Sequence, residues 1–161
     1  MPLISRVRPR IGDVIEIDTP KGLAYAHYTH KHNTPPYYGA LLRVLPGLHA
    51  ERPLRFSSLV ALPPAFSTFF PLGPACNRGI VRIVATEELP QHSQAFPTFR
   101  NGHIDRQGKH VGPWFLWNGT REWRVAALTP AELAAYPPLQ GVNDTALIEM
   151  IVSGWRHERS A

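Results

Sequence analysis

The chain has 161 residues, of which 43% are apolar and 18% are charged, a globular composition that excludes an intrinsically disordered chain. This length suits one domain, and we expect residues 1–161 to form a single domain. The formal net charge of +5 is spread along the chain and fits either a solvated surface or a patch that attracts an acidic protein or a nucleic acid, and the single cysteine excludes an internal disulfide and a cysteine-based zinc site.

The first third of the chain predicts three antiparallel strands joined by short connections. Thr19-Pro20-Lys21-Gly22 is a turn sequence, and the polar loop at residues 30–36 ends in two prolines that stop strand pairing. Strands are expected on either side of these breaks, at residues 13–18, 23–29 and 37–45. A meander of this kind curls readily, so we expect an antiparallel, partly barrel-like β-sheet.

The middle of the chain is less regular. Residues 54–62 predict a fourth strand between prolines, and residues 80–85 predict a fifth. The aromatic stretch at residues 65–72 is expected to be buried, as either helix or strand, and residues 74–78 to form a short helical turn that a glycine ends. Residues 86–113 are rich in proline and glycine, and we expect a long surface loop there.

Two helices are predicted near the end of the chain. Thr129 and Glu132 form a capping-box sequence with Pro130 at the first helical position, and two later prolines keep this helix short. Asn143 is expected to cap a longer helix that runs to residue 153. Because strands come first and helices last, the fold class is predicted to be α+β, with a short and a longer C-terminal helix.

The most distinctive segment is a hairpin rich in tryptophan and arginine. Residues 114–117 and 122–125 flank Asn118-Gly119, which is the strongest short-range signal for a hairpin turn. The hairpin is either a two-sided core element or one with an exposed aromatic face, and tryptophan and arginine on such a face are typical of interface hot spots and of base stacking. The candidate partner-binding residues in and near it are Trp114, Trp117, Arg121, Trp123, Arg124, Arg100 and Arg106.

The sequence offers little that predicts a metal site. His30 and His32 are two residues apart on a predicted strand or its end, so their side chains point to one side and are the weak metal-ligand candidates. A third ligand would come from His103 or His110. The alternative is a polar hairpin tip with ordinary histidines. No cofactor is expected.

Residues for covalent or acid–base catalysis are equally sparse. Cys76 lies near Arg78, which could lower a thiol pKa, although a lone cysteine is more commonly a small buried apolar residue. The sequence contains no Gly-x-Ser-x-Gly, no Gly-x-Gly-x-x-Gly and no phosphate-binding Gly-Lys-Ser/Thr loop. We therefore nominate no catalytic residue, and the sequence favours a binding protein over an enzyme.

The expected location is the cytoplasm. The first ten residues contain no uninterrupted apolar run of the kind found in a signal peptide, and a lone cysteine fits a reducing compartment. No apolar run approaches the ~20 residues that a membrane span requires, so we expect no membrane partner.

Several short motifs resemble the immunity protein 26 family of bacterial polymorphic toxin systems. The order of features is similar to that family over about two thirds of the chain, from Ile11-Gly12-Asp13-Val14-Ile15-Glu16-Ile17 and Gly22-Leu23-Ala24-Tyr25-Ala26 to Arg78-Gly79-Ile80-Val81-Arg82-Ile83-Val84, Glu88-Leu89-Pro90 and Phe96-Pro97-Thr98-Phe99-Arg100. The loop at residues 30–36 and the hairpin at residues 114–124 are not marks of that family.

What the resemblance implies is a cytoplasmic protein that binds and neutralises a cognate toxin, with no catalytic residues to transfer. The positive charge predicts an acidic patch on that toxin. The alternative from the residues themselves is a basic, small-β-barrel module that binds nucleic acid, which the arginine and tryptophan hairpin would serve.

Overall fold

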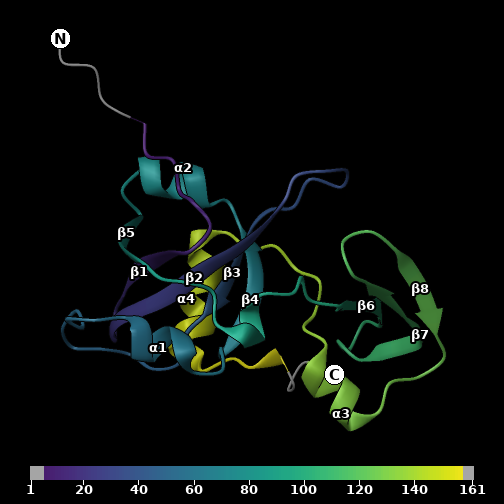
Figure 1. The fold of residues 1–161 in the computed structure, drawn as a ribbon. Helices are drawn as coiled ribbons and strands as arrows, with labels where there is room; N and C mark the ends of the chain where they lie inside the picture. Colours follow the sequence, from purple (N-terminus) through teal and green to yellow (C-terminus); the bar gives the residue numbers. More distant parts are fainter. Residues whose placement is uncertain (1–5, 158–161) are drawn as a thin grey trace.

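The computed structural model describes residues 6–157, which form two antiparallel sheets and four α-helices. The larger sheet has the strand order β4-β3-β2-β1-β5, and the smaller has the order β6-β7-β8 (Figure 1). The predicted α+β class is confirmed. The strands are β1 (Asp13–Thr19), β2 (Gly22–His32), β3 (Gly39–Val44), β4 (Phe66–Phe70), β5 (Val81–Thr86), β6 (Phe99–Ile104), β7 (His110–Trp117) and β8 (Glu122–Val125).

The helices are short and lie between or after the strands. Two of them precede the smaller sheet and two follow it (Figure 1). Their bounds are α1 (Ser57–Ala61), α2 (Leu72–Asn77), α3 (Pro130–Ala135) and α4 (Asp144–Ser153), with a 3-10 turn, η1, at Gln91–Ser93. Within residues 6–157, no helix has the length and apolar character needed to cross a membrane.

The larger sheet is open, so the expectation of a partly barrel-like sheet is corrected. Its edge strands, β4 and β5, do not pair with each other. Instead, the outer side of β4 pairs with residues 140–142: the Phe69 amide donates to the Gln140 carbonyl and the Val142 amide donates to the Phe69 carbonyl, both at 3.0 Å. A later segment of the chain therefore occupies the edge that barrel closure would need.

Apolar side chains of the larger sheet form cores on both of its faces. One face packs against α4 and α2, with Ile15, Leu42 and Leu147 fully buried between them. The opposite face packs against α1, where Val60 meets Tyr25. A third cluster, of Leu41, Phe69 and Phe99 with partly buried neighbours, joins the two sheets. Burial on both faces explains why β1, β2 and β3 are almost continuously buried.

A β-bulge in β2 decides which side chains share a face. Tyr28 pairs with Leu42, but His30 pairs with Leu41, so one extra residue, Thr29, is inserted in β2. The insertion shifts the alternation of side chains. As a result, Lys31 lies on the face that carries Tyr28, and His30 lies on the opposite face.

The termini of the two C-terminal helices are as predicted. The Thr129 hydroxyl accepts from the Glu132 amide and the Glu132 carboxylate accepts from the Thr129 amide, which completes the capping box. Asn143 Oδ1 accepts from the Ala146 amide at 2.8 Å, and α4 ends at Gly154, whose φ of 69° is the left-handed conformation that favours glycine.

Two predictions for the middle of the chain are wrong. Residues 54–62 form no strand; they contain α1, because the buried residues Phe56 and Val60 are four apart and so lie on one side of a helical turn. Residues 86–113 are not one long loop, since they include η1, all of β6 and the start of β7. The undecided stretch at residues 65–72 is mainly a strand, β4, whose five residues are all buried.

Candidate functional site

The tryptophan- and arginine-rich hairpin is formed by β7 and β8, as predicted. Asn118 shapes its turn: the side-chain Oδ1 accepts from the Thr120 and Arg121 amides at 3.1 and 3.0 Å. The strand pairing places Phe115 opposite Arg124 and Leu116 opposite Trp123. The three-stranded sheet that contains the hairpin stands beside the larger sheet, so the strand farthest from it, β8, is at the outside of the molecule (Figure 1).

Trp117 and Trp114 pack against other ring side chains of the molecule. Trp117 belongs to the cluster that joins the two sheets, with its ring 5.8 Å from that of Phe99 and 4.7 Å from that of His32. Trp114 stacks on His110 with ring centroids 3.6 Å apart and nearly parallel planes. Both tryptophans are half-buried, and these contacts indicate a packing role for each.

Arg100 is likewise not a surface residue. Its exposed fraction is 2%, and its guanidinium donates to the carbonyls of Tyr136 and His157 at 2.8 and 2.6 Å. It also lies 5.3 Å from the centre of the Trp114 ring. Burial lowers the pKa of Arg100. The side chain thus ties β6 to α3 and to the segment that follows α4.

Of the remaining candidates, the three arginines are exposed on the smaller sheet and Trp123 is half-buried. The Arg121 guanidinium lies 5.3 Å from the centre of the half-buried Trp123 ring, and Arg124 is exposed on the next residue of β8. The outer side of β8 pairs with no other strand among residues 6–157. We call Arg121, Trp123 and Arg124 the β8 edge. Arg106 is exposed at the turn between β6 and β7.

The structure adds exposed apolar residues that the sequence did not single out. Ile104, at the end of β6, is 68% exposed, and Val111, near the start of β7, is 45% exposed. They flank the turn that carries Arg106 and Lys109, which are both exposed. Sequence reasoning missed them because it placed this segment in an irregular loop.

The histidines do not form a metal site among the described residues. His30 and His32 share one face of β2, but their rings pack against Phe96 at 5.6 and 5.9 Å. His30 Nε2 also lies 3.0 Å from the Gln94 carbonyl oxygen. His103 and His110 contact aromatic rings of the smaller sheet instead. Between residues 6 and 157, no three His, Cys, Asp or Glu side chains are placed to hold one ion.

Cys76 is a buried apolar residue in α2. Burial raises the pKa of its thiol to about 11, the opposite of the lowering that Arg78 could have produced. A thiol with this pKa is almost entirely protonated near neutral pH, and the thiolate is the nucleophilic form. Cys76 is therefore not placed to act as a nucleophile.

Glu16, in the middle of β1, is a buried carboxylate whose pKa is strongly lowered; the residue is 1% exposed. Its carboxylate accepts from Arg52 at 2.7 and 2.9 Å, from Arg82 at 2.6 Å and from the Tyr25 hydroxyl at 2.8 Å. Hydrogen bonds from Arg52 above all lower its pKa from 4.5 to about 2. A carboxylate held ionised in this way accepts hydrogen bonds and does not donate a proton near neutral pH.

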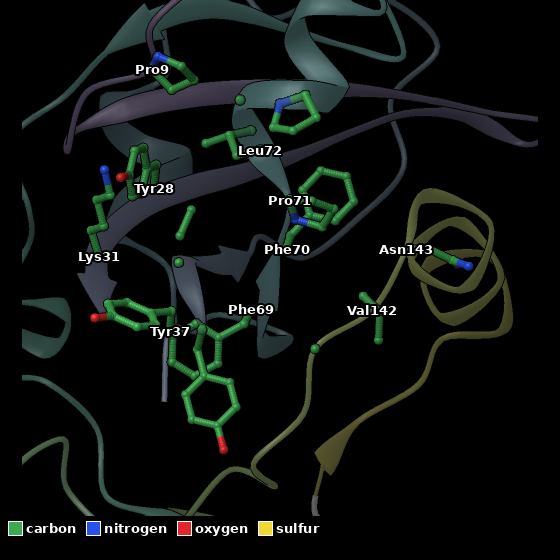
Figure 2. A pocket seen from close by; sticks show the side chains of 16 residues that line it. Pro9, Tyr28, Lys31, Tyr37, Phe69, Phe70, Pro71, Leu72, Val142 and Asn143 are labelled. Atoms are coloured by element: carbon green, nitrogen blue, oxygen red, sulfur yellow. The ribbon is translucent and has the colours of Figure 1, made fainter. Parts of the chain in front are cut away.

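A groove of about 650 Å³ lies between β2, β3, the start of α2 and residues 141–143, and it is open to solvent (Figure 2). Its walls are mainly aromatic rings and prolines, with one cation, Lys31. Figure 2 shows Tyr28 and Lys31 on one side of it and Val142 and Asn143 on the other. The principal aromatic and proline residues are Tyr28, Tyr37, Tyr38, Phe70 and Pro71.

Three of the five motifs that resemble the immunity protein 26 family lie on adjacent strands of the larger sheet. The first falls on β1, the second on β2 and the third on β5, and β1 pairs with both of the others. The Leu89-Pro90 motif follows β5, and the last motif leads into β6. No protein-family model, no curated protein and no solved structure matches this chain.

Proposed function

We propose that this chain is a non-enzymatic binding protein of the immunity type, which neutralises a cognate bacterial toxin in the cytoplasm by binding it directly. The observation that carries the proposal is the β8 edge, where Arg121 lies over Trp123, the exposed Arg124 lies on the other face of the strand, and the strand has no outer partner among the described residues. Arginine and tryptophan are the residues that most often dominate binding energy at protein interfaces.

The charge of the smaller sheet supports an acidic partner. All ion pairs between residues 6–157 involve Arg52, in the loop before α1, or Arg82, on β5 of the larger sheet. The exposed cations of the smaller sheet form none with another described residue, so their charge is available to a partner; they are Arg106, Lys109, Arg121 and Arg124. An excess of one charge accelerates association with a partner of the opposite charge and fixes its orientation.

The free edge of β8 also offers a backbone mode of binding. An unpaired edge strand presents amide and carbonyl groups that a strand of another protein can join. The short length of β8 and its exposed charges disfavour aggregation through that edge while leaving it accessible. The resemblance to the immunity protein 26 family agrees with a toxin as the partner.

The test begins with capture of the partner. The tagged protein is used as bait in nuclease-treated lysate of its own source cells, and the captured protein is then produced separately. The proposal expects a captured protein that arrests growth when expressed alone, with growth restored by co-expression of this chain. Restoration by the wild type but equally by the double variant Arg121→Glu/Arg124→Glu would contradict the assignment of the β8 edge.

The alternative function, nucleic-acid binding, is favoured by the same cations and by Trp123. Its binding would weaken steeply with salt, because phosphate contacts release counterions. Capture of material that disappears after nuclease treatment, together with a gel shift of single-stranded RNA or DNA at low salt, would replace the toxin proposal with this one. No gel shift at low salt would exclude it.

A further inference from the structure

The open groove beside β2 has the chemistry of a site for an extended peptide. Its lining includes five aromatic rings and three prolines, and it is open to solvent rather than enclosed (Figure 2). Proline-rich segments adopt the polyproline II conformation, which makes no internal hydrogen bonds and packs its rings into aromatic-lined grooves. Tyr37, which is 73% exposed on the rim, supplies such a surface without having to move out of a core, and the half-buried Tyr38, stacked on Phe69, lines the groove beside it.

A hydrogen-bond donor, the Tyr28 hydroxyl, belongs to the lining of this groove. Tyr28 is only 5% exposed and is one of the groove's lining residues. Burial raises the pKa of Tyr28, so the hydroxyl stays protonated and can donate. The carbonyl groups of a polyproline II segment have no partner within the segment, and they are the acceptors that such a tyrosine hydroxyl binds.

The only cation in the groove wall sits on the same side as this donor. The β-bulge in β2 brings Lys31 onto the face of the sheet that carries Tyr28 (Figure 2). Lys31 is exposed and forms no ion pair with another described residue. Its position therefore selects a segment that carries negative charge at the end lying next to β2.

We propose that this groove binds an extended, proline-rich segment of a partner protein that has acidic residues at one end. The groove is lined by residues of β2, β3, β4, α2 and the segment 141–143, and by none of the β8 edge, so the proposal goes beyond the function assigned to that edge. The rings hold the prolines, the Tyr28 hydroxyl donates to a backbone carbonyl, and Lys31 pairs with the acidic end.

The experiment uses a synthetic hexaproline peptide that ends in two glutamates. Amide shifts of the ¹⁵N-labelled full chain are followed during titration, with three variants chosen at exposed positions so that the fold is kept. Lys31→Glu reverses the charge in the groove, and Tyr37→Ala removes an aromatic wall. Lys21→Glu is the matched control, an exposed lysine in the turn between β1 and β2.

The proposal expects saturable shifts around Tyr28, Ala40 and Val142. Lys31→Glu should raise the Kd for this peptide about tenfold and lower it for a peptide ending in two lysines, whereas Lys21→Glu should do neither. Tyr37→Ala should weaken both peptides. Equally tight binding of a hexa-alanine peptide with the same acidic end would overturn the proposal. Amide shifts that change with protein concentration but not with peptide concentration would also overturn it.

Toxin binding through the β8 edge and peptide binding in the groove can be tested independently of each other. The variant Arg121→Glu/Arg124→Glu changes only the β8 edge, so it should bind the proline peptide as the wild type does. Loss of peptide binding in that variant, or no saturable shift in the wild-type protein, would exclude the groove as a peptide site while leaving the toxin proposal standing.

Discussion

The Tyr25 hydroxyl donates a 2.8 Å hydrogen bond to Oε2 of Glu16, its direct cross-strand neighbour. On the other side of Glu16, the cross-strand neighbour is Arg82, which donates to Oε1. One buried carboxylate therefore links three adjacent strands, β2, β1 and β5, and it also holds Arg52 of the loop before α1. This arrangement explains how a charged side chain is tolerated in the middle of a buried strand.

Replacement of Glu16 by glutamine should destabilise the fold. The amide keeps the size of the side chain but loses the charge that two arginines and a tyrosine hydroxyl complement, so we expect the free energy of unfolding to fall by ~1–3 kcal/mol. Urea unfolding followed by circular dichroism measures the change. Glu149→Gln, at an exposed position on α4, is the control and should change little. An equal effect of both variants would refute the structural role of Glu16.

The same carboxylate predicts an acid-sensitive stability. Because hydrogen bonds from the arginines lower the Glu16 pKa from 4.5 to about 2, the folded state favours the ionised form. Its contribution is complete above the unfolded-state pKa and is lost as the pH falls from about 4.5 toward 2. The stability difference between wild type and Glu16→Gln should therefore shrink over this interval. A difference that stays constant between neutral pH and the acid limit would show that Glu16 is not the titrating group.

Substitution of Gly102 by alanine should move the His110 ring. A Cβ at this position would lie 2.5 Å from His110 Nε2 and 3.2 Å from an atom of Trp114, so the stacked pair cannot stay in place. His110 is half-buried at the start of β7 and can rotate away, so we expect a stability loss of only about 1 kcal/mol. Proton NMR of His110 should lose the ring-current shift caused by Trp114. An unchanged shift would contradict the stacking.

The thiol of Cys76 should react only when the protein unfolds. Burial raises its pKa to about 11, and the side chain lies in the core beside the larger sheet. At about pH 8 a thiol-specific reagent should label the native protein far more slowly than the protein in denaturant. Cys76→Ser provides the unlabelled baseline. Complete labelling of the native protein within the mixing time would mean that the thiol is accessible.

Local sequence signals predicted the segments whose structure depends on nearby residues. Asn118-Gly119 identified the β7–β8 hairpin: the Asn118 side chain accepts from two amides of the connection, and Gly119 takes a positive φ of 97° there. Thr129 and Glu132 identified the start of α3, and Asn143 identified the start of α4, since each cap is completed within three residues.

Segments that depend on distant partners were not predicted. The strand β6 was taken for a loop because its sequence is polar and glycine-containing, and it forms by pairing with β7 and with residues 137–139. Similarly, the free edge of the larger sheet could not be foreseen to pair with residues 140–142, about 70 positions after β4. The expected barrel failed for this reason.

The candidate site was predicted only in part. The sequence identified the hairpin but not which of its residues are exposed. Trp117 packs between the two sheets, whereas Arg121 and Arg124 are exposed. The groove had no sequence signal, because its shared face for Tyr28 and Lys31 arises from the bulge at Thr29. Regular alternation would place residues three apart on opposite faces.

The most direct test of the proposed function is the affinity of the captured toxin for charge-reversed forms of this protein. Calorimetric titration compares the wild type with Arg121→Glu/Arg124→Glu and with the matched control Arg55→Glu/Arg78→Glu, which reverses two exposed arginines on the other part of the molecule. We predict one-to-one binding by the wild type and the control, and a Kd raised at least about 30-fold by the β8-edge variant, which corresponds to ~2 kcal/mol. Equal affinities of all three proteins would contradict binding through the β8 edge.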